Sequence, residues 1–424
     1  MRRAVALIDG EHYAPVVRDA LSGLPYRVVA AVVVGGTEKL RGGDDYGVPL
    51  ADDLDAALDE HAPDVVFDLS DEPVLGPRER FLVASRVLAR GIPYEGADFR
   101  FDPPELRPFP LPSLGIVGTG KRIGKTAVGG YVARLLARDH DVVVVAMGRG
   151  GPAEPQVAEV SPTVEDLLEL SRAGAHAASD YLEDAALAGV VTIGCRRCGG
   201  GLAGAPVVSN VAEGARLAAE RRPDLVVFEG SGAALPPIAT TRRVLVAGAH
   251  QAPELVTGYL NAYRVLVSDL VVLTMAEEGA RHEEVRAAVQ ELKPGLPVVA
   301  TRMRPRPVDD VRGRRVAFFS TAPEDVLPSL VEHLEGEHGA EVVRASSNLA
   351  RRDDLRRDLD DLDAEVFLVE IKAAAIDVVA EAAAERGAEI VFCDNELLPL
   401  EGEPDLDAEL LALAQAARRE GVRR

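Results

Sequence analysis

The sequence predicts an α/β fold built mainly on parallel sheets, and three observations lead to this prediction. Short runs rich in valine, isoleucine and leucine alternate with segments of helical periodicity along the 424 residues. Apolar residues make up 47% of the chain, so two or three domains with packed cores are expected. One strand-like run leads directly into a glycine-rich turn and a helix, an arrangement typical of α/β proteins that bind phosphate groups.

Residues 1–108 predict a small doubly wound domain of Rossmann or flavodoxin type. Its strands are expected at Val5–Asp9, Arg27–Val34, Asp64–Leu69 and Ile92–Tyr94, and its helices at Pro15–Ser22, Asp52–His61 and Pro77–Arg90. The segment from Asp102 to Pro112 then carries five prolines in eleven residues. Because proline disfavours both helix interiors and central strands, this segment is expected to link two domains.

Residues 109–330 predict a second, larger α/β domain. Its strands are expected at Leu114–Val117, Asp141–Ala146, Val190–Ile193, Leu225–Phe228, Val244–Val246, Leu270–Leu273, Pro297–Ala300 and Val316–Phe319. Residues 331–424 predict a C-terminal α/β block with strands at Glu341–Arg344, Val366–Val369 and Ile390–Cys393 and helices at Ala373–Arg386 and from about Leu406. Periodicity does not decide whether this block is separate or extends the second sheet.

The composition excludes several classes of protein. The formal net charge of -22 would repel the phosphate backbone of a nucleic acid. Three cysteines in 424 residues suit a reducing cytosol and do not make a disulfide scaffold. The apolar run before Asp9 is too short for a signal peptide, and no uncharged run approaches the roughly 18 residues of a membrane span. A cytoplasmic protein with neither a nucleic-acid partner nor a membrane partner is expected.

The strongest chemical signal is the turn Gly118-Thr-Gly-Lys-Arg-Ile-Gly-Lys-Thr126, which opens a helix expected over Ala127–Arg138. Its backbone N–H groups form a nest for phosphate oxygens, so the second domain is predicted to be P-loop NTPase-like. Lys125 is expected to reach the β- and γ-phosphates, and the Thr126 hydroxyl to take one position on Mg²⁺. The predicted nucleotide site comprises Gly118, Thr119, Gly120, Lys121, Arg122, Ile123, Gly124, Lys125, Thr126 and Ala127.

The first glycine of this turn departs from the common phosphate-loop pattern. G-x-x-x-x-G-K-[ST] would place a glycine at Thr119, whereas Gly118 stands one position earlier. The form G-T-x-x-x-[IV]-G-K-T resembles the phosphate loop of dethiobiotin synthetase and its relatives.

A second element, Glu229-Gly-Ser-Gly232, follows an apolar strand. A carboxylate at a strand end can hold Mg²⁺ against nucleotide phosphates, although it can also be a buried acid that caps the next segment. The element resembles the E-G-x-G sequence of the same synthetases, whose glutamate binds the metal, and this resemblance implies a metal site made by Thr126 and Glu229.

Further cations stand in the predicted strand-end loops. Lys121 and Arg122 lie inside the turn, where with Lys125 they would stabilise charge in phosphoryl transfer or hold a second phosphorylated molecule. Arg149 follows a predicted strand in a glycine-rich setting suited to binding a phosphate or a carboxylate. A solvated surface arginine is the alternative for that position.

The loop Gly194-Cys-Arg-Arg-Cys-Gly-Gly-Gly201 carries two more arginines between two cysteines. Zinc needs four ligands and the sequence offers no second Cys-x-x-Cys pair, so Cys195 and Cys198 are expected to pack the loop. Arg196 and Arg197 are then expected to approach an anionic substrate.

Two outlying residues complete the candidate substrate contacts. His12, in Asp9-Gly-Glu-His-Tyr13 at the end of the first predicted strand, would act as an acid/base group or a phosphate contact. Lys372, one of five lysines, directly follows a predicted buried strand and would meet the substrate. A capped helix start with surface charges explains the His12 region equally well.

Taken together, the elements beginning at Asp9, Gly118, Gly194, Glu229 and Lys372 resemble cyclic 2,3-diphosphoglycerate synthetase, over nearly the whole chain. The resemblance implies an ATP-dependent ligase that closes an intramolecular phosphoanhydride in 2,3-bisphosphoglycerate and releases ADP and phosphate. It also implies a homodimer. A surplus of cations beyond those that ATP needs independently favours a polyanionic second substrate.

Two alternatives stay open from the residues. One is another ATP-dependent ligase or kinase of the dethiobiotin synthetase type, acting on a different acid. The other is a nucleotide-dependent switch or metallochaperone in which the Cys195 and Cys198 loop carries a metal.

Overall fold

The computed structural model describes residues 1–424 except 37, 42–44, 174–179, 372–374 and 422–424. The chain divides into two compact units. The N-terminal unit contains Met1–Glu105 together with Ala252–Val267 and Glu283–Gly295, and the main unit contains Leu106–Gln251, Ser268–His282 and Leu296–Arg424. The boundary at Glu105 falls inside the proline-rich segment.

The N-terminal unit is built on one sheet with the strand order β3-β2-β1-β4-β5-β6, in which only β6 runs antiparallel to its neighbour. Its strands are β1 (Arg3–Ile8), β2 (Arg27–Val33), β3 (Leu50–Ala51), β4 (Val65–Asp68), β5 (Tyr94–Glu95) and β6 (Arg100–Phe101). Its helices are α1 (Ala14–Gly23), α2 (Leu54–His61) and α3 (Pro77–Ala89). Alternating βα units of this kind give the doubly wound arrangement.

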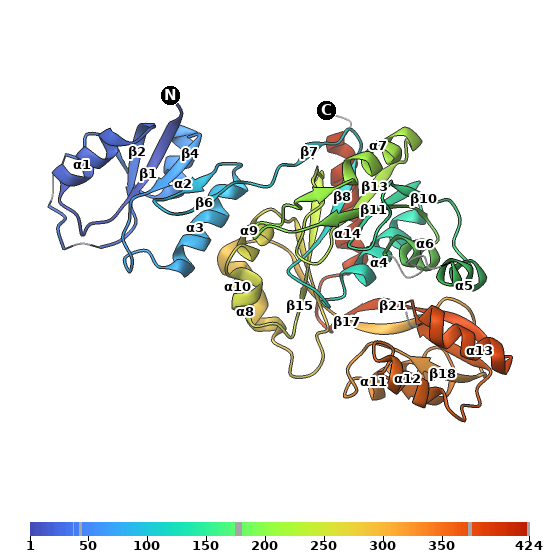
Figure 1. Ribbon diagram of the computed structural model, residues 1–424. Coiled ribbons are helices and arrows are strands. Elements are labelled where there is room, and N and C mark those ends of the chain that lie inside the picture. The colour runs from blue at the N-terminus through green and yellow to red at the C-terminus, as the bar shows by residue number, and fades with distance from the viewer. Residues whose placement is uncertain (37, 42–44, 174–179, 372–374, 422–424) are drawn as a thin grey trace. The chain divides into compact units, whose positions relative to one another are not determined.

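A later part of the chain completes the N-terminal unit with α8 (Pro253–Thr257), α9 (Asn261–Leu266) and α10 (His282–Leu292). Helix α9 packs beside α3 (Figure 1). The rings of Phe81 and Tyr259 meet edge-on at 5.7 Å, and the Ser85 hydroxyl donates a hydrogen bond to the Tyr259 carbonyl at 3.2 Å. The sequence did not predict this return, because contacts of high sequence separation leave no local periodic signal.

The main unit contains one long sheet with the order β10-β11-β9-β13-β8-β15-β16-β17-β21-β20-β18-β19, and β12 pairs with β11. Its strands are β8 (Ser113–Gly118), β9 (Val142–Gly148), β10 (Gln156–Ala158), β11 (Val191–Cys198), β12 (Val208–Ser209), β13 (Leu225–Glu229), β15 (Arg242–Gly248), β16 (Leu270–Thr274), β17 (Val298–Pro307), β18 (Arg315–Phe319), β19 (Glu341–Ser346), β20 (Val366–Glu370) and β21 (Glu389–Pro399). The short strands β7 (Arg107–Pro108) and β14 (Ile238–Ala239) pair separately. The pairs from β11 to β17 are parallel, so the predicted α/β fold with mainly parallel sheets is confirmed.

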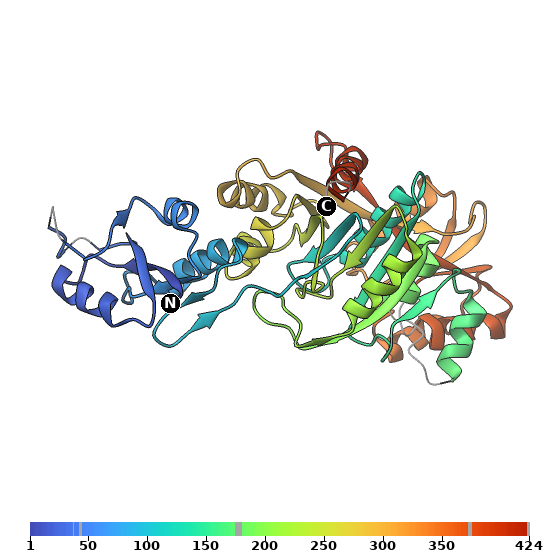
Figure 2. The ribbon, with the colours of Figure 1, turned by 90° about the horizontal axis from the view of Figure 1, so that it is seen from above.

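Helices cover both faces of this sheet. They are α4 (Lys125–Ala137), α5 (Val164–Arg172), α6 (Asp180–Ala188), α7 (Val211–Arg221), α11 (Leu327–Gly336), α12 (Arg352–Leu359), α13 (Glu381–Arg386) and α14 (Leu406–Gly421), with a π-helix at Ala375–Ala380. In β9, Val142 and Val144 pack with α4 and α14, whereas Val143 and Val145 pack with α7 on the other face. This alternation places α14 (red) and α7 (yellow-green) on opposite sides of the sheet (Figure 2).

The C-terminal block continues the main sheet. The first half of β17 pairs with β16 in parallel, and its second half pairs with β21 antiparallel from Thr301 to Pro307. The predicted strand at Pro297–Ala300 is shorter than β17, which continues to Pro307. The prediction ended too early because the arginines and prolines that follow break the apolar run. No helix in the described part of the chain is long and apolar enough to cross a membrane.

Candidate functional site

The predicted phosphate turn lies where neighbouring parallel strands end. Strands β11, β9, β13, β8, β15 and β16 stand side by side, so their carboxyl ends share one edge of the sheet. The residues at those ends are Cys198, Gly148, Glu229, Gly118, Gly248 and Thr274. This edge is the usual ligand-binding position of open α/β sheets.

Two left-handed residues shape the turn between β8 and α4. Arg122 has φ 57° and Gly124 has φ 71°, and Ile123 between them is buried, 1% exposed. The Thr274 hydroxyl at the end of β16 donates a hydrogen bond to the Ile123 carbonyl at 2.7 Å. An added Cβ at Gly124 would lie 2.6 Å from Sδ of Met303, so both the backbone conformation and the close packing require glycine there.

The displaced first glycine has a structural explanation. The Thr119 hydroxyl donates to Oε1 of Gln251 at 2.9 Å, and the Gly248 backbone N–H donates to the same oxygen at 3.0 Å. Thr119 therefore turns inward and joins the loop to the end of β15. An added Cβ at Gly118 would lie 3.0 Å from Ile123 and 3.1 Å from the Gly232 carbonyl, so the close approach falls at 118 and glycine is needed there.

The cationic and hydroxyl residues of the turn are accessible. Lys121 and Arg122 are exposed, and Lys125 and Thr126, which begin α4, are partly exposed, as is Ala127. Positive charge and free N–H groups at a helix start favour an anion at this end of α4.

Glu229 lies buried against the first turns of α4. The distance from its Oε1 to an added Cβ at Gly129 would be only 1.6 Å, so this glycine makes room for the carboxylate. Burial raises the pKa of Glu229 to about 7, against the lowering effect of Lys125. A buried carboxyl group at this position needs a partner to remain charged.

A second acid, Asp184 of α6, accompanies Glu229. Burial and then the charge of Glu229 raise the pKa of Asp184 well above its ordinary value, while Lys125 lowers it. Oε1 of Glu229 and Oδ2 of Asp184 are buried without a hydrogen-bond partner among the described residues. Two unsatisfied carboxylate oxygens beside a phosphate-binding turn fit a hard divalent cation such as Mg²⁺.

A group of cations surrounds Gly232, beyond Glu229. A Cβ added at Gly232 would lie 2.5 Å from Nη2 of Arg149 and 3.7 Å from Cγ of Lys121. Arg197 donates to the Ser231 carbonyl at 2.8 Å, and its Nε is buried with no partner in the described chain. Burial, and then the charge of Arg149, lowers the pKa of Arg197. Like charges held together in this way favour binding of a multiply charged anion.

The side chains of the other residues of the cysteine-bearing loop face different sides of β11. Arg196 is exposed and is adjacent to Arg197 on β11, so its side chain points to the opposite side of the strand. Cys195 is 1% exposed, and burial raises the pKa of its thiol to about 12, whereas Cys198 is exposed. Because the two cysteines stand three residues apart on one strand, they face opposite ways and do not form a joint metal site.

His12 belongs to a paired network in the N-terminal unit. Its Nδ1 lies 2.8 Å from Oδ1 of Asp9, and its Nε2 lies 3.4 Å from Oδ2 of Asp71. Asp9 also accepts backbone hydrogen bonds from Glu11 and Asp71, and although burial opposes them these interactions lower the pKa of Asp9. Lys372, the remaining predicted contact, lies outside the described residues.

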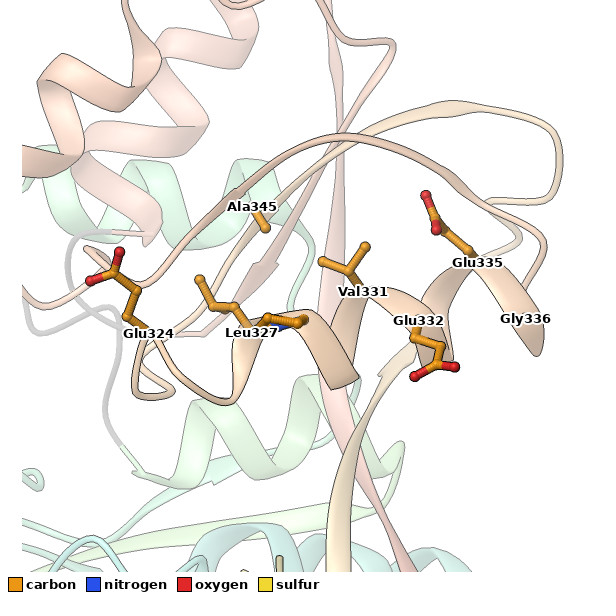
Figure 3. A pocket seen from close by; sticks show the side chains of 8 residues that line it. Glu324, Leu327, Val331, Glu332, Glu335, Gly336 and Ala345 are labelled. Carbon is orange, nitrogen blue, oxygen red and sulfur yellow. The ribbon is translucent and has the colours of Figure 1, made fainter. Parts of the chain in front are cut away.

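A hollow lies elsewhere, along α11 (Figure 3). It has a volume of about 820 Å³, and Glu324, Glu332 and Glu335 line it together with apolar side chains such as Leu327 and Val331. Among the described residues that line it there are three carboxylates and no cation, which does not suit a polyanionic substrate.

Sequence reasoning missed several residues at this edge of the sheet. Asp184 stands in Asp180-Tyr-Leu-Glu-Asp184, which has the pattern of an ordinary amphipathic helix. Thr274 carried one available signal, since it directly follows the predicted strand Leu270–Leu273 and ends β16 on the ligand-binding edge, whereas Gln251 lies beyond the end of β15 and carried no such signal. A search for polar residues at every strand end would have found Thr274.

A phosphate-binding turn on a helix N-terminus, at the carboxyl edge of a parallel sheet, defines the class of this protein as P-loop NTPase-like. Models of cyclic 2,3-diphosphoglycerate synthetase match three segments, namely its N-terminal domain over residues 3–102, its P-loop domain over 113–302 and its C-terminal domain over 307–396. The chain belongs to the cyclic 2,3-diphosphoglycerate synthetase family. The predicted family, and with it an enzyme of the ATP-dependent synthetase class, is confirmed.

Individual relatives support the assignment along the whole chain. Cyclic 2,3-diphosphoglycerate synthetase of Rubrobacter xylanophilus is 54% identical, covering 98% of this chain and 98% of the relative. The Methanothermus fervidus protein of that name is 42% identical, with 93% and 92% covered. Among solved structures, LpxK from Aquifex aeolicus in complex with ATP is 14% identical with a TM-score of 0.40, covering 73% of this chain and 90% of that chain.

Proposed function

We propose that the chain uses ATP to close an intramolecular phosphoanhydride in 2,3-bisphosphoglycerate, giving the cyclic product, ADP and phosphate. The observation that carries this proposal is the group of like charges around Gly232, where Lys121, Arg149 and Arg197 lie together. Such mutual repulsion has a cost that a bound polyanion removes. The family relationship supports the same substrate.

The reaction divides into two displacements. An oxygen of one substrate phosphate attacks the γ-phosphorus of ATP in line, and ADP leaves with the electron pair of the broken bond. The neighbouring phosphate then attacks the activated phosphorus, and inorganic phosphate leaves as the ring closes. Lys125, Lys121 and Arg122 would neutralise the charge that develops on the transferred group, and no protein nucleophile is needed.

Thr126 and Glu229 are the proposed residues for Mg²⁺, with Asp184 beside Glu229. The unpartnered buried oxygens of Glu229 and Asp184 support this assignment. When bound, the ion would supply electrostatic stabilisation of the nucleotide phosphates. Lys125 would offset the charge of both carboxylates on the protein side.

The first experiment is phosphorus NMR of the full chain with Mg·ATP and 2,3-bisphosphoglycerate. We expect a pair of coupled phosphoanhydride signals together with ADP and phosphate. ATP hydrolysis without new anhydride signals would exclude 2,3-bisphosphoglycerate as the substrate and favour a ligase or kinase acting on another acid. Cys195 is buried and Cys198 is exposed, and the two face opposite sides of β11, which disfavours the metallochaperone alternative.

A matched set of arginine variants tests substrate binding. Arg149→Ala and Arg197→Ala should raise the KM for 2,3-bisphosphoglycerate by roughly tenfold or more and change the KM for ATP much less. Arg196→Ala is the comparison, because Arg196 was predicted to bind substrate but its side chain points to the other side of β11. An equal effect of all three variants would contradict a binding site centred on Gly232.

The predicted homodimer and the predicted cytoplasmic location remain proposals. The three cysteines are free in the structure, which supports a reducing compartment. Light scattering of the purified chain would measure the oligomeric state, and a monomeric mass at assay concentration would contradict the homodimer.

A further inference from the structure

A cluster of metal-ligating side chains lies away from the phosphate turn, in the C-terminal block. His333 stands in the last turn of α11, His338 follows that helix, and Glu396 lies on β21. Nε2 of His333 is 3.2 Å from Oε1 of Glu396, and Nε2 of His338 is 3.6 Å from the same oxygen. The three candidate ligand atoms all lie within 4.8 Å of one another.

The two distances to Oε1 of Glu396 match the edges of a small coordination polyhedron. Metal–ligand bonds of 2.0–2.1 Å in a tetrahedral zinc site place neighbouring ligand atoms about 3.3 Å apart. The His338–Glu396 separation is too long for a good hydrogen bond, and Nε2 of His338 is buried without a hydrogen-bond partner in the described chain. The two imidazole rings meet nearly edge-to-face, with centroids 5.4 Å apart. Hydrogen bonding alone therefore does not account for the arrangement.

The ligand set also selects the kind of ion. Two imidazole nitrogens and one carboxylate oxygen suit Zn²⁺ or a similar transition metal, whereas Mg²⁺ and Ca²⁺ prefer oxygen ligands throughout. The side chains of His333, His338 and Glu396 are 11%, 25% and 29% exposed, so solvent can reach a fourth position. The nearby positive charge of Arg134 is offset by its ion pair with Asp394.

We propose that His333, His338 and Glu396 form a binding site for one divalent transition-metal ion, typified by Zn²⁺. The ion joins the end of α11 to β21. Because β21 pairs with the part of β17 that carries Met303, and Met303 packs against Gly124 of the phosphate turn, the site strengthens the part of the sheet that supports the turn. The site is separate from the proposed Mg²⁺ site, and this proposal does not depend on which substrate the chain uses.

Cobalt titration of the full chain tests this proposal. With excess Mg²⁺ and ADP present to occupy the phosphate turn, Co²⁺ should bind once per chain with the visible absorption of a low-symmetry histidine site, and Zn²⁺ should displace it. His338→Gln and Glu396→Gln should each weaken binding by roughly tenfold or more, since each removes one of three protein ligands. Zn²⁺ should raise the Tm of the unaltered chain and not that of the variants.

Two matched variants test whether the cobalt ion binds at another site. Cys198→Ser removes the exposed thiol, and His12→Gln disrupts the Asp9, His12 and Asp71 group in the N-terminal unit. Both should leave the cobalt spectrum and affinity unchanged. Absence of stoichiometric binding would overturn the proposal, as would a spectrum that depends on Cys198 or His12 but not on His338 and Glu396. Circular dichroism of each variant separates loss of a ligand from loss of the fold.

Discussion

Both units place charged residues at the carboxyl ends of parallel strands, but the two units differ in whether those charges have hydrogen-bond partners. In the N-terminal unit, Asp68 accepts hydrogen bonds from Ser70, Tyr94 and Arg80, and Asp9 is similarly surrounded by donors. In the main unit, Glu229 has a buried oxygen without a described partner, as does Asp184.

The difference indicates where a ligand is needed. A buried charge that has all its hydrogen bonds within the protein needs no further partner. Buried carboxylates without partners, and arginines that repel one another, cost stability until a ligand of opposite charge arrives. We therefore expect the ligand at the main unit's edge and a structural role for the paired charges of the N-terminal unit.

Loss of the phosphate-turn lysine should have the largest effect. Lys125→Ala should lower the rate of ATP-dependent ring closure by roughly 10²–10³-fold, because it removes the cation expected at the transferred phosphate. Phosphorus NMR time courses measure this rate. Lys39→Ala is the control, since Lys39 belongs to the N-terminal unit, where it pairs with the exposed Glu38 and lies over the Tyr13 ring. A residual rate near that of the unaltered chain would break the assignment of the site.

Two adjacent glycines offer a sharper test. Gly129→Ala places a methyl group 1.6 Å from the present Glu229 oxygen and should displace that carboxylate, lowering the rate by roughly 10²-fold. Gly130→Ala meets only a flexible arginine tip at 3.5 Å and should keep full activity while stabilising α4 by about 0.5–1 kcal/mol. Kinetics and thermal melts of the pair measure both effects, and equal rates for the two variants would show that the position of Glu229 does not matter.

A variant of Asp184 tests stability and Mg²⁺ binding separately. Asp184→Asn should raise the free energy of unfolding by about 1 kcal/mol in the absence of Mg²⁺, because it removes a carboxyl group that is buried beside Glu229. The same variant should need several times more Mg²⁺ for half-maximal activity. Thermal melts with and without Mg²⁺, together with a Mg²⁺ titration of the rate, measure the two effects. A variant less stable than the parent without Mg²⁺ would mean that Asp184 has a structural partner.

The sequence predicted the parts of this edge that local patterns encode. The phosphate turn was recognisable from Gly124, Lys125 and Thr126, because a loop that wraps a phosphate needs these residue types in immediate succession. Asp184 was not, because only folding brings α6 against Glu229. The return of α9 to α3 was equally hidden, and it depends on contacts such as that of Phe81 with Tyr259.

The His12 variant should have the smallest effect and bears most directly on the comparison. His12 was predicted to contact the substrate, yet both of its ring nitrogens face carboxylates of its own unit, and its side chain is 35% exposed. His12→Gln should therefore change the KM for 2,3-bisphosphoglycerate by less than about threefold, and stability by about 1 kcal/mol or less. Asp71→Asn disturbs the same pairing from the other side and should give the same small changes. A KM that rises tenfold in His12→Gln but not in Asp71→Asn would show that the histidine meets the substrate directly, and that a paired residue at this edge can still serve binding.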